Sequence, residues 1–183
     1  MGGGSSNAAT TLWALNKLLG NRFTLADLIK WSAEIGSDVS FFLSQGTAYC
    51  TGRGEIIYPL PSLKCQPLWI VKPNQGTSTP AVYKRLDVSK LIARDPEKTV
   101  RNFYKNKPDY FNDLEQPAME ELPELAEIKH KLLQAGFKTV LLSGSGSSFF
   151  CLGPYTPPPL PNCRIFDAKW IQRSAKTWYG EEI

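Results

Sequence analysis

The first residues after the start methionine, Gly2, Gly3, Gly4, Ser5 and Ser6, are of the types that bind phosphate. Backbone N–H groups at a helix N-terminus bind anions because they have no partner within the helix, and small side chains leave them accessible. A helical pattern follows at once, so the run fits a phosphate-binding loop. It is not a Walker loop, since no lysine precedes the serines. A flexible glycine-serine linker explains the same composition, and these residues alone leave both interpretations open.

Asp38, in the sequence GSDVSFF, is the candidate general base. A carboxylate placed beside a substrate hydroxyl can accept its proton during phosphoryl transfer. An aspartate between a helix end and two phenylalanines can also be a buried N-cap of the next helix, which is the more common role. One residue can do both.

A second run of small residues, LLSGSGSSFF, contains Gly144, Ser145, Gly146 and Ser147. The simplest interpretation is a tight turn between two strands. The functional interpretation is a second flexible loop that approaches the first. Two glycine-serine loops and a single aspartate form a combination that fits a kinase.

Composition narrows the class of protein. The 183 residues are 42% hydrophobic and 21% charged, and a formal charge of +4 is spread along the chain, which is typical of a soluble globular protein. A nucleic-acid site on the basic segment 98–107 is the weakest alternative. The four cysteines form no CxxC pair and there is one histidine, so neither a zinc site nor a disulfide framework is expected. We also expect no membrane span.

The N-terminal part of the chain predicts two helices. The first runs to Leu19, with Ser5 or Ser6 as its N-cap. The second begins with a capping box at Thr24 and ends at Gly36, where a positive φ is expected.

After these helices the pattern changes to strands, which we expect in one antiparallel or mixed sheet. A short helix should start at Ser78 or Thr79, with Pro80 in its first turn. The proline-rich segment 156–161 is expected to connect two strands. The chain is therefore predicted to be α+β, with strands over 46–51, 56–60, 67–71, 138–144 and 163–171 and further helices within 95–110 and 113–135.

Six motifs in this order, GGGSSNAA, GSDVSFF, GTAYCTGRGE, STPAVYKRL, NDLEQPA and LLSGSGSS, resemble those of the GHMP kinase superfamily. The resemblance spans nearly the whole chain. It points to the branch that phosphorylates the cytidine diphosphate ester of methylerythritol in non-mevalonate isoprenoid biosynthesis, in its plant and chlamydial form. It implies a two-domain α+β GHMP kinase fold, with the rest of the ATP-binding domain over 1–66 and the C-terminal domain over 67–183.

The resemblance implies a role for each candidate in the first domain. Residues 2–6 would be the end of the ATP phosphate-binding motif, with Ser5 or Ser6 near the phosphates or their Mg²⁺. Asp38 would take the proton from the 2-hydroxyl of the methylerythritol unit as this hydroxyl attacks the γ-phosphate.

In the second domain, Thr79 and Pro80 match positions that contact the substrate side. Gly144, Ser145, Gly146 and Ser147 match the third GHMP motif, which supports the active-site loops. Asn112, Asp113 and Glu115 are interpreted as structural, since the start of a short acidic helix mostly needs caps.

The resemblance begins part-way through the family's sequence, so its first strands, its lysine partner of the catalytic aspartate and its cytosine-binding aromatic residues have no counterpart here. We therefore expect an N-terminal domain that lacks its first strands and exposes apolar surface, with poor solubility or association. Activity of this chain alone would be weak or absent.

Three alternatives stay open at this point: a GHMP kinase acting on homoserine, one acting on mevalonate, and a catalytically dead remnant that binds nucleotide or a partner protein. The expected compartment is the bacterial cytoplasm, or the plastid stroma for a plant or alga. The expected ligands are ATP, Mg²⁺ and the cytidine diphosphate substrate, with no nucleic acid or membrane.

Overall fold

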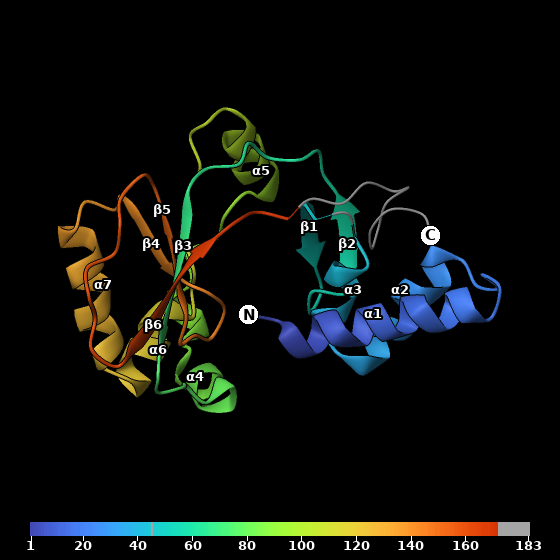
Figure 1. Ribbon diagram of the computed structural model, residues 1–183, viewed down its shortest axis with the longest axis horizontal. Coiled ribbons are helices and arrows are strands. Elements are labelled where there is room, and N and C mark those ends of the chain that lie inside the picture. Colours follow the sequence, from blue (N-terminus) through green and yellow to red (C-terminus); the bar gives the residue numbers. More distant parts are fainter. Residues whose placement is uncertain (45, 172–183) are drawn as a thin grey trace. The chain divides into compact units, whose positions relative to one another are not determined.

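A computed structural model describes residues 1–44 and 46–171, which form an α+β protein (Figure 1). The chain divides into two compact units, Gly2–Lys64 and Cys65–Trp170. Within the described residues, none of the helices combines the length and the apolar character that a membrane crossing requires.

The unit Gly2–Lys64 is mainly helical and has a small core. The buried side chains of Ala9, Leu28, Val39 and Leu43 form that core. Its two strands pair antiparallel as a hairpin, with Tyr49 opposite Tyr58. Its elements are α1 (Gly3–Leu18), α2 (Leu25–Ile35), α3 (Val39–Phe42), β1 (Ala48–Thr51) and β2 (Ile56–Pro59).

Helix α1 begins earlier than its sequence suggests. Its N-cap is Gly2 at φ 70°, so the predicted N-cap at Ser5 or Ser6 is wrong and both serines lie in the first turns. Gly2 can take this left-handed conformation without strain, and a Cβ there would meet the ring of Phe42 at 2.7 Å. The predicted stop at Gly20 is confirmed, since its φ is 78°.

Helix α2 has the predicted capping box. The Thr24 hydroxyl accepts from the Asp27 N–H, and the Asp27 carboxylate accepts from the Thr24 N–H. Gly36 ends the helix in extended backbone at φ 175°, so the predicted positive φ is wrong. The extended residue leads directly into the turn before α3, where its carbonyl accepts from the Val39 N–H.

The unit Cys65–Trp170 is built on a four-stranded antiparallel sheet with the order β4-β5-β3-β6. Because β3 belongs to this sheet and β1 and β2 form their own hairpin, the predicted single sheet is wrong. The predicted turn between β4 and β5 and the predicted connection between β5 and β6 are confirmed. The elements are β3 (Leu68–Pro73), α4 (Thr79–Arg85), the 3₁₀ helix η1 (Val88–Lys90), α5 (Pro96–Tyr104), α6 (Glu115–Glu121), α7 (Glu124–Gln134), β4 (Thr139–Leu142), β5 (Phe149–Leu152) and β6 (Cys163–Ala168).

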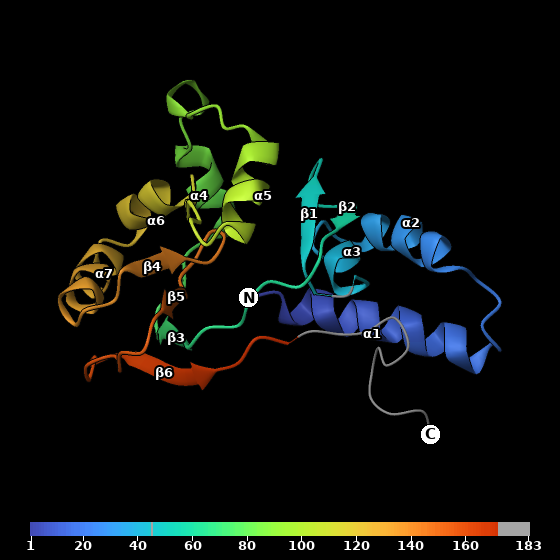
Figure 2. The same cartoon turned by 90° about the horizontal axis from the view of Figure 1, so that it is seen from above.

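One face of the four-stranded sheet carries the main core. Figure 2 shows α6 and α7 on one side of the strands and α5 on the other. Alternate strand residues such as Val71 and Phe149 are fully buried against Leu125 and Leu132 of α7. The opposite face carries Leu68, Ile70 and Lys72 of β3, and the ammonium of Lys72 hydrogen-bonds to the turn between β4 and β5.

Candidate active site

The turn between β4 and β5 contacts the start of α4. The Thr79 hydroxyl lies 2.8 Å from the Ser145 hydroxyl, and the Thr77 hydroxyl donates to the Ser145 carbonyl at 2.7 Å. Ser78 is the N-cap of α4, and Pro80 stands in the first turn beside Thr79. Two candidates that are distant in sequence, Thr79 and residues 144–147, are therefore brought together.

The glycines of this turn have conformations that other residues rarely adopt. Gly144 has φ 58° and Gly146 has φ 91°. A Cβ on Gly146 would lie 3.0 Å from the Leu142 side chain, so there is also little space for one. The turn is closed by hydrogen bonds from the Gly146 N–H to the Ser143 carbonyl and from the Ser143 N–H to the Ser148 carbonyl. These glycines are needed for the shape of the turn.

Asn112 and Glu115 hold the turn through hydrogen bonds to the backbone at its start. The Asn112 amide donates to the carbonyls of Leu142 and Gly144, each at 2.8 Å. The Glu115 carboxylate accepts from the Leu142 N–H at 2.9 Å and forms an ion pair with Lys129. These side chains are thus more than local caps, because they fix the end of β4 and the start of the turn.

Asp113 has a different structural role. Its carboxylate pairs with Arg94 at 2.9 Å, and the guanidinium of Arg94 lies 3.7 Å from the centre of the Phe111 ring. This arrangement fixes the segment between α5 and α6 at the surface of the unit.

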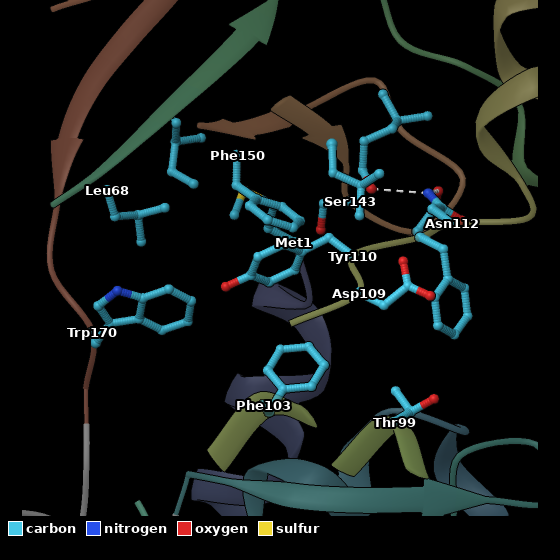
Figure 3. Close-up of a pocket in the computed structure, with 15 residues that line it drawn as sticks. Met1, Leu68, Thr99, Phe103, Asp109, Tyr110, Asn112, Ser143, Phe150 and Trp170 are labelled. Carbon is cyan, nitrogen blue, oxygen red and sulfur yellow. Dashed lines mark hydrogen bonds between the residues drawn. The ribbon is translucent and has the colours of Figure 1, made fainter. Parts of the chain in front are cut away.

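An apolar hollow of about 610 Å³ lies beside Asn112, on the sheet face opposite α6 and α7 (Figure 3). Phe103, Tyr110 and Phe150 line it with rings packed edge to face. Among the described residues that line it, Asp109 is the only carboxylate. The hollow is therefore a poor place for phosphoryl transfer, and the polar groups of the site lie on the turn.

Lys72, at the end of β3, reaches the same turn. Its ammonium donates to the Ser147 hydroxyl at 2.8 Å. Sequence reasoning misses this residue, because a lone lysine at the end of a strand is ordinarily a solvated charge. The only signal is its place at the end of an apolar strand that leads into the segment before α4.

Tyr83 is a second residue that sequence reasoning misses. It lies one turn after Thr79 on α4, and its side chain is 57% exposed. Residues four apart share one face of a helix, so the ring stands on the same face as Thr79. An exposed aromatic ring on a candidate binding face is the type of group that stacks on a base.

The N-terminus of α1 fits a phosphate group. Gly2 provides no side-chain cap, and the first turn contains no acidic residue. A Cβ on Gly3 or Gly4 would meet nothing within 4 Å, so the backbone N–H groups of the first turn are accessible. Residues 2–6 could thus hold a phosphate with backbone donors alone.

Asp38 precedes α3 with an exposed side chain that makes no cap hydrogen bond. The interpretation as a buried N-cap is therefore wrong. Burial raises the pKa of the nearby Cys50 thiol, and the negative charge of Asp38 raises that pKa further. Within the described residues, the carboxylate is thus not used to cap α3.

No group of three or more histidine, cysteine, aspartate or glutamate side chains that could hold a metal ion is found among the described residues.

A family match distinguishes the kinase interpretation of residues 2–6 from the linker interpretation. Sequence-family models of the GHMP kinases N terminal domain and of the GHMP kinases C terminal match residues 1–46 and 88–158. The chain belongs to the GHMP kinases.

Two relatives of this GHMP kinase have the same enzyme name. The chain is 51% identical over 182 residues to the 4-diphosphocytidyl-2-C-methyl-D-erythritol kinase of Protochlamydia amoebophila, with 98% of this chain and 60% of that protein covered. It is 40% identical to the chloroplastic enzyme of that name from Arabidopsis thaliana, with 99% of this chain and 51% of that protein covered. The chain thus spans about half to three-fifths of the length of these relatives.

Solved structures agree with the GHMP kinase fold. A crystal structure of 4-(cytidine 5'-diphospho)-2C-methyl-D-erythritol kinase matches with a TM-score of 0.70 at 35% identity, over 84% of this chain and 56% of that one. A homoserine kinase from Cytophaga hutchinsonii matches with a TM-score of 0.60 at 17% identity, over 90% and 64%. The second likeness shows the fold alone. The predicted fold and family are confirmed, and because the family match begins at residue 1, residues 2–6 are family sequence and not a linker.

Proposed function

We propose that this chain takes part in the ATP-dependent phosphorylation of the 2-hydroxyl of 4-diphosphocytidyl-2-C-methyl-D-erythritol, a step of non-mevalonate isoprenoid biosynthesis. The observation that carries the proposal is the 51% identity over 98% of the chain to a protein of that name. In this proposal, residues 1–66 belong to the ATP-binding domain and 67–183 to the C-terminal domain.

Asp38 is the proposed general base. It accepts the proton of the substrate hydroxyl while the hydroxyl oxygen bonds to the γ-phosphorus, and the bond from this phosphorus to the bridging oxygen breaks to release ADP. Its exposed carboxylate, with no cap hydrogen bond of its own, supports this role.

Residues 2–6 are proposed to bind the phosphates of ATP. The backbone N–H groups of Gly3, Gly4 and Ser5 would donate to phosphate oxygens at the positive end of α1. Mg²⁺, when bound, would neutralise the charge that develops on the transferred phosphate. With no acidic cluster among the described residues, the hydroxyl of Ser5 or Ser6 would be its protein contact in this chain.

Thr79, Pro80 and the turn at 144–147 are proposed to form the substrate side. The paired hydroxyls of Thr79 and Ser145 can donate to phosphate or sugar oxygens. Tyr83 would stack on the cytosine, whereas the sequence alone predicts no cytosine-binding aromatic residue in this chain. This last role predicts that Tyr83→Ala raises KM more than it lowers kcat.

The test is ADP formation with Mg-ATP and 4-diphosphocytidyl-2-C-methyl-D-erythritol, for this chain alone and for this chain mixed with the N-terminal segment of the chlamydial relative. Turnover in either case supports the proposal. Asp38→Asn should then lower kcat by roughly 10²–10⁴-fold. Glu34→Gln, an exposed acid on α2, is the matched control and should leave kcat unchanged.

Nucleotide binding without turnover in both preparations would contradict the proposal and favour the dead remnant. Turnover with homoserine or mevalonate but not with the cytidyl substrate would instead assign a different GHMP kinase activity.

A further inference from the structure

We propose that Lys72 is a positioning residue that holds the turn 143–148 against the segment before α4. Through this turn it would set the geometry of the Thr79–Ser145 face. The consequence for substrate binding rests on the proposed function, but the structural part of the inference does not.

The ammonium of Lys72 makes hydrogen bonds to two segments of the chain. It donates to the Pro73 carbonyl at 2.6 Å, to the Ser147 hydroxyl at 2.8 Å and, more weakly, to the Gln75 carbonyl at 3.4 Å. An ammonium group has three hydrogens, and each therefore has an acceptor. The side chain thereby joins the end of β3 to the turn between β4 and β5.

Hydrogen-bond direction makes this connection specific. Because an ammonium only donates, the Ser147 oxygen must accept from Lys72. The Ser147 hydroxyl is then left to donate to the Gln75 carbonyl, which lies 2.7 Å away. Ser147 is only 2% exposed, so water does not readily replace either bond. Lys72, Ser147 and Gln75 form a closed polar network, which we call the lysine clamp.

The charge of Lys72 has no carboxylate partner. Among the described residues, no carboxylate oxygen lies within 4.0 Å of its ammonium, whereas Lys129 in the same unit pairs with Glu115. Lys72 is half-buried, so its ammonium loses part of its hydration without gaining a counter-charge, and the clamp contributes little net stability. What it provides is a fixed position for the turn, through charge-assisted hydrogen bonds that are stronger than those between neutral groups.

The clamp is one of three connections from residues 72–79 to the turn 143–148. The others are neutral bonds from Thr77 and Thr79 to Ser145. Lys72 bonds to the turn at Ser147, and the two threonines bond to it at Ser145. Without Lys72, Ser147 keeps only its bond to the Gln75 carbonyl, so the turn is held less firmly and the Thr79–Ser145 pair no longer has one geometry.

Hydrogen exchange of the full chain tests the clamp without any activity. Lys72→Met keeps a long side chain but removes the ammonium, Ser147→Ala removes its acceptor, and Lys138→Met is a control at an exposed lysine of the same unit. We expect amide exchange in peptides covering 143–148 to rise about tenfold in Lys72→Met and in Ser147→Ala. The double variant should be no faster than Ser147→Ala, because Ser147→Ala already removes the Lys72 contact together with the Ser147–Gln75 bond.

Unchanged exchange at 143–148 in both single variants would overturn the proposal. Exchange that also rises throughout β5 and α7 would overturn it as well, since Lys72 would then support the whole unit. Ser147→Ala removes a single oxygen, and so gives a folded test even where Lys72→Met does not fold.

The kinetic readout uses the ADP assay. Lys72→Met should raise KM for the cytidyl substrate about tenfold with kcat changed less than threefold, because the turn positions substrate without touching the reacting atoms. Lys72→Arg should recover part of this loss, and Lys138→Met should have none. A loosened turn with unchanged KM would contradict the positioning role. Absence of turnover in the unaltered protein would count against the proposed function, and the exchange result would still decide the clamp.

Discussion

The two units of the chain bury very different amounts of apolar side chain. Within the described residues, the core of Cys65–Trp170 contains thirteen buried residues and that of Gly2–Lys64 contains four. Helices α1 and α2 leave large apolar side chains in solvent, including Leu18 at 83% exposed and Ile35 at 56%. The unit Gly2–Lys64, which carries Asp38 and the proposed phosphate-binding residues, therefore depends on further apolar contacts for its stability. The unit Cys65–Trp170, which carries the glycine turn, has a larger core of its own.

The largest expected effect is on the larger core. Phe149→Ala should cost about 3–5 kcal/mol of unfolding free energy, because Phe149 is fully buried and its neighbours cannot fill the space. Leu43→Ala, equally buried in the smaller core, should cost less than this, about 2–3 kcal/mol, since the few residues around it can collapse.

Urea unfolding followed by hydrogen exchange reports on each unit separately. Equal losses of unfolding free energy in the two units would contradict the difference between the two cores. A single transition for the whole chain, monomeric in the ultracentrifuge, would also contradict the exposed apolar surface of the first unit.

Cysteine labelling tests the difference between the two units without any substitution. Burial raises the pKa of Cys151 to about 12 from an ordinary value of 9.0, so at pH 8 its thiolate is scarce. Cys50, in the small unit, is half-buried and its pKa is also raised. We expect a thiol reagent at pH 8 to modify Cys50 at least about a hundredfold faster than Cys151, as resolved by peptide mass spectrometry. Similar rates would mean that the two units open equally often.

Gly2→Ala tests the conformation of the first unit. Its φ of 70° and the 2.7 Å approach to Phe42 should make this change cost about 1–2 kcal/mol and weaken nucleotide binding. Gly3→Ala is the matched control for stability, since Gly3 is helical with open space around it, and it should stabilise α1 slightly. A nucleotide titration together with a melting curve measures both effects. Equal losses in the two variants would argue against a special role of the left-handed Gly2.

The smallest expected effect concerns Asp27 in the capping box of α2. Hydrogen bonds from Thr24 lower the pKa of this carboxyl below its ordinary 3.8. Its contribution to stability is therefore present above pH 3.8 and is lost as the pH falls through the lowered value. Asp27→Asn should flatten the decrease in melting temperature of the small unit between about pH 5 and pH 2. An unchanged pH profile would show that the box does not limit this unit.

Local patterns predict much of the fold. The capping box at Thr24, the stop at Gly20, the start of α4 at Ser78 and the turn between β4 and β5 all follow from residue types within a few positions. The start of α1 and the conformation of Gly36 do not, because Phe42 and α3 determine them from outside each helix. Strand partners are also outside the reach of local patterns, and so the separation of β3 from β1 and β2 is not predicted.

The candidate site is predictable only in part. The types of Thr79 and residues 144–147 mark them individually, but only the fold joins them. Lys72 has no local pattern that distinguishes it from a surface lysine. Its role depends on two backbone carbonyls beside the end of β3 and one buried hydroxyl in a distant turn, which no spacing rule describes.

The position of β3 at the centre of its sheet has a consequence for synthesis on the ribosome. Val71 pairs with Phe149 and Ile165, so both neighbours of this strand are translated long after it. The nascent chain must carry an apolar strand without partners while α4 to α7 emerge, and this strand can close its sheet only when β6 has left the exit tunnel. The interval is a window for chaperone binding, and a ribosome stalled before residue 163 should expose 68–73 to a protease that spares the finished protein.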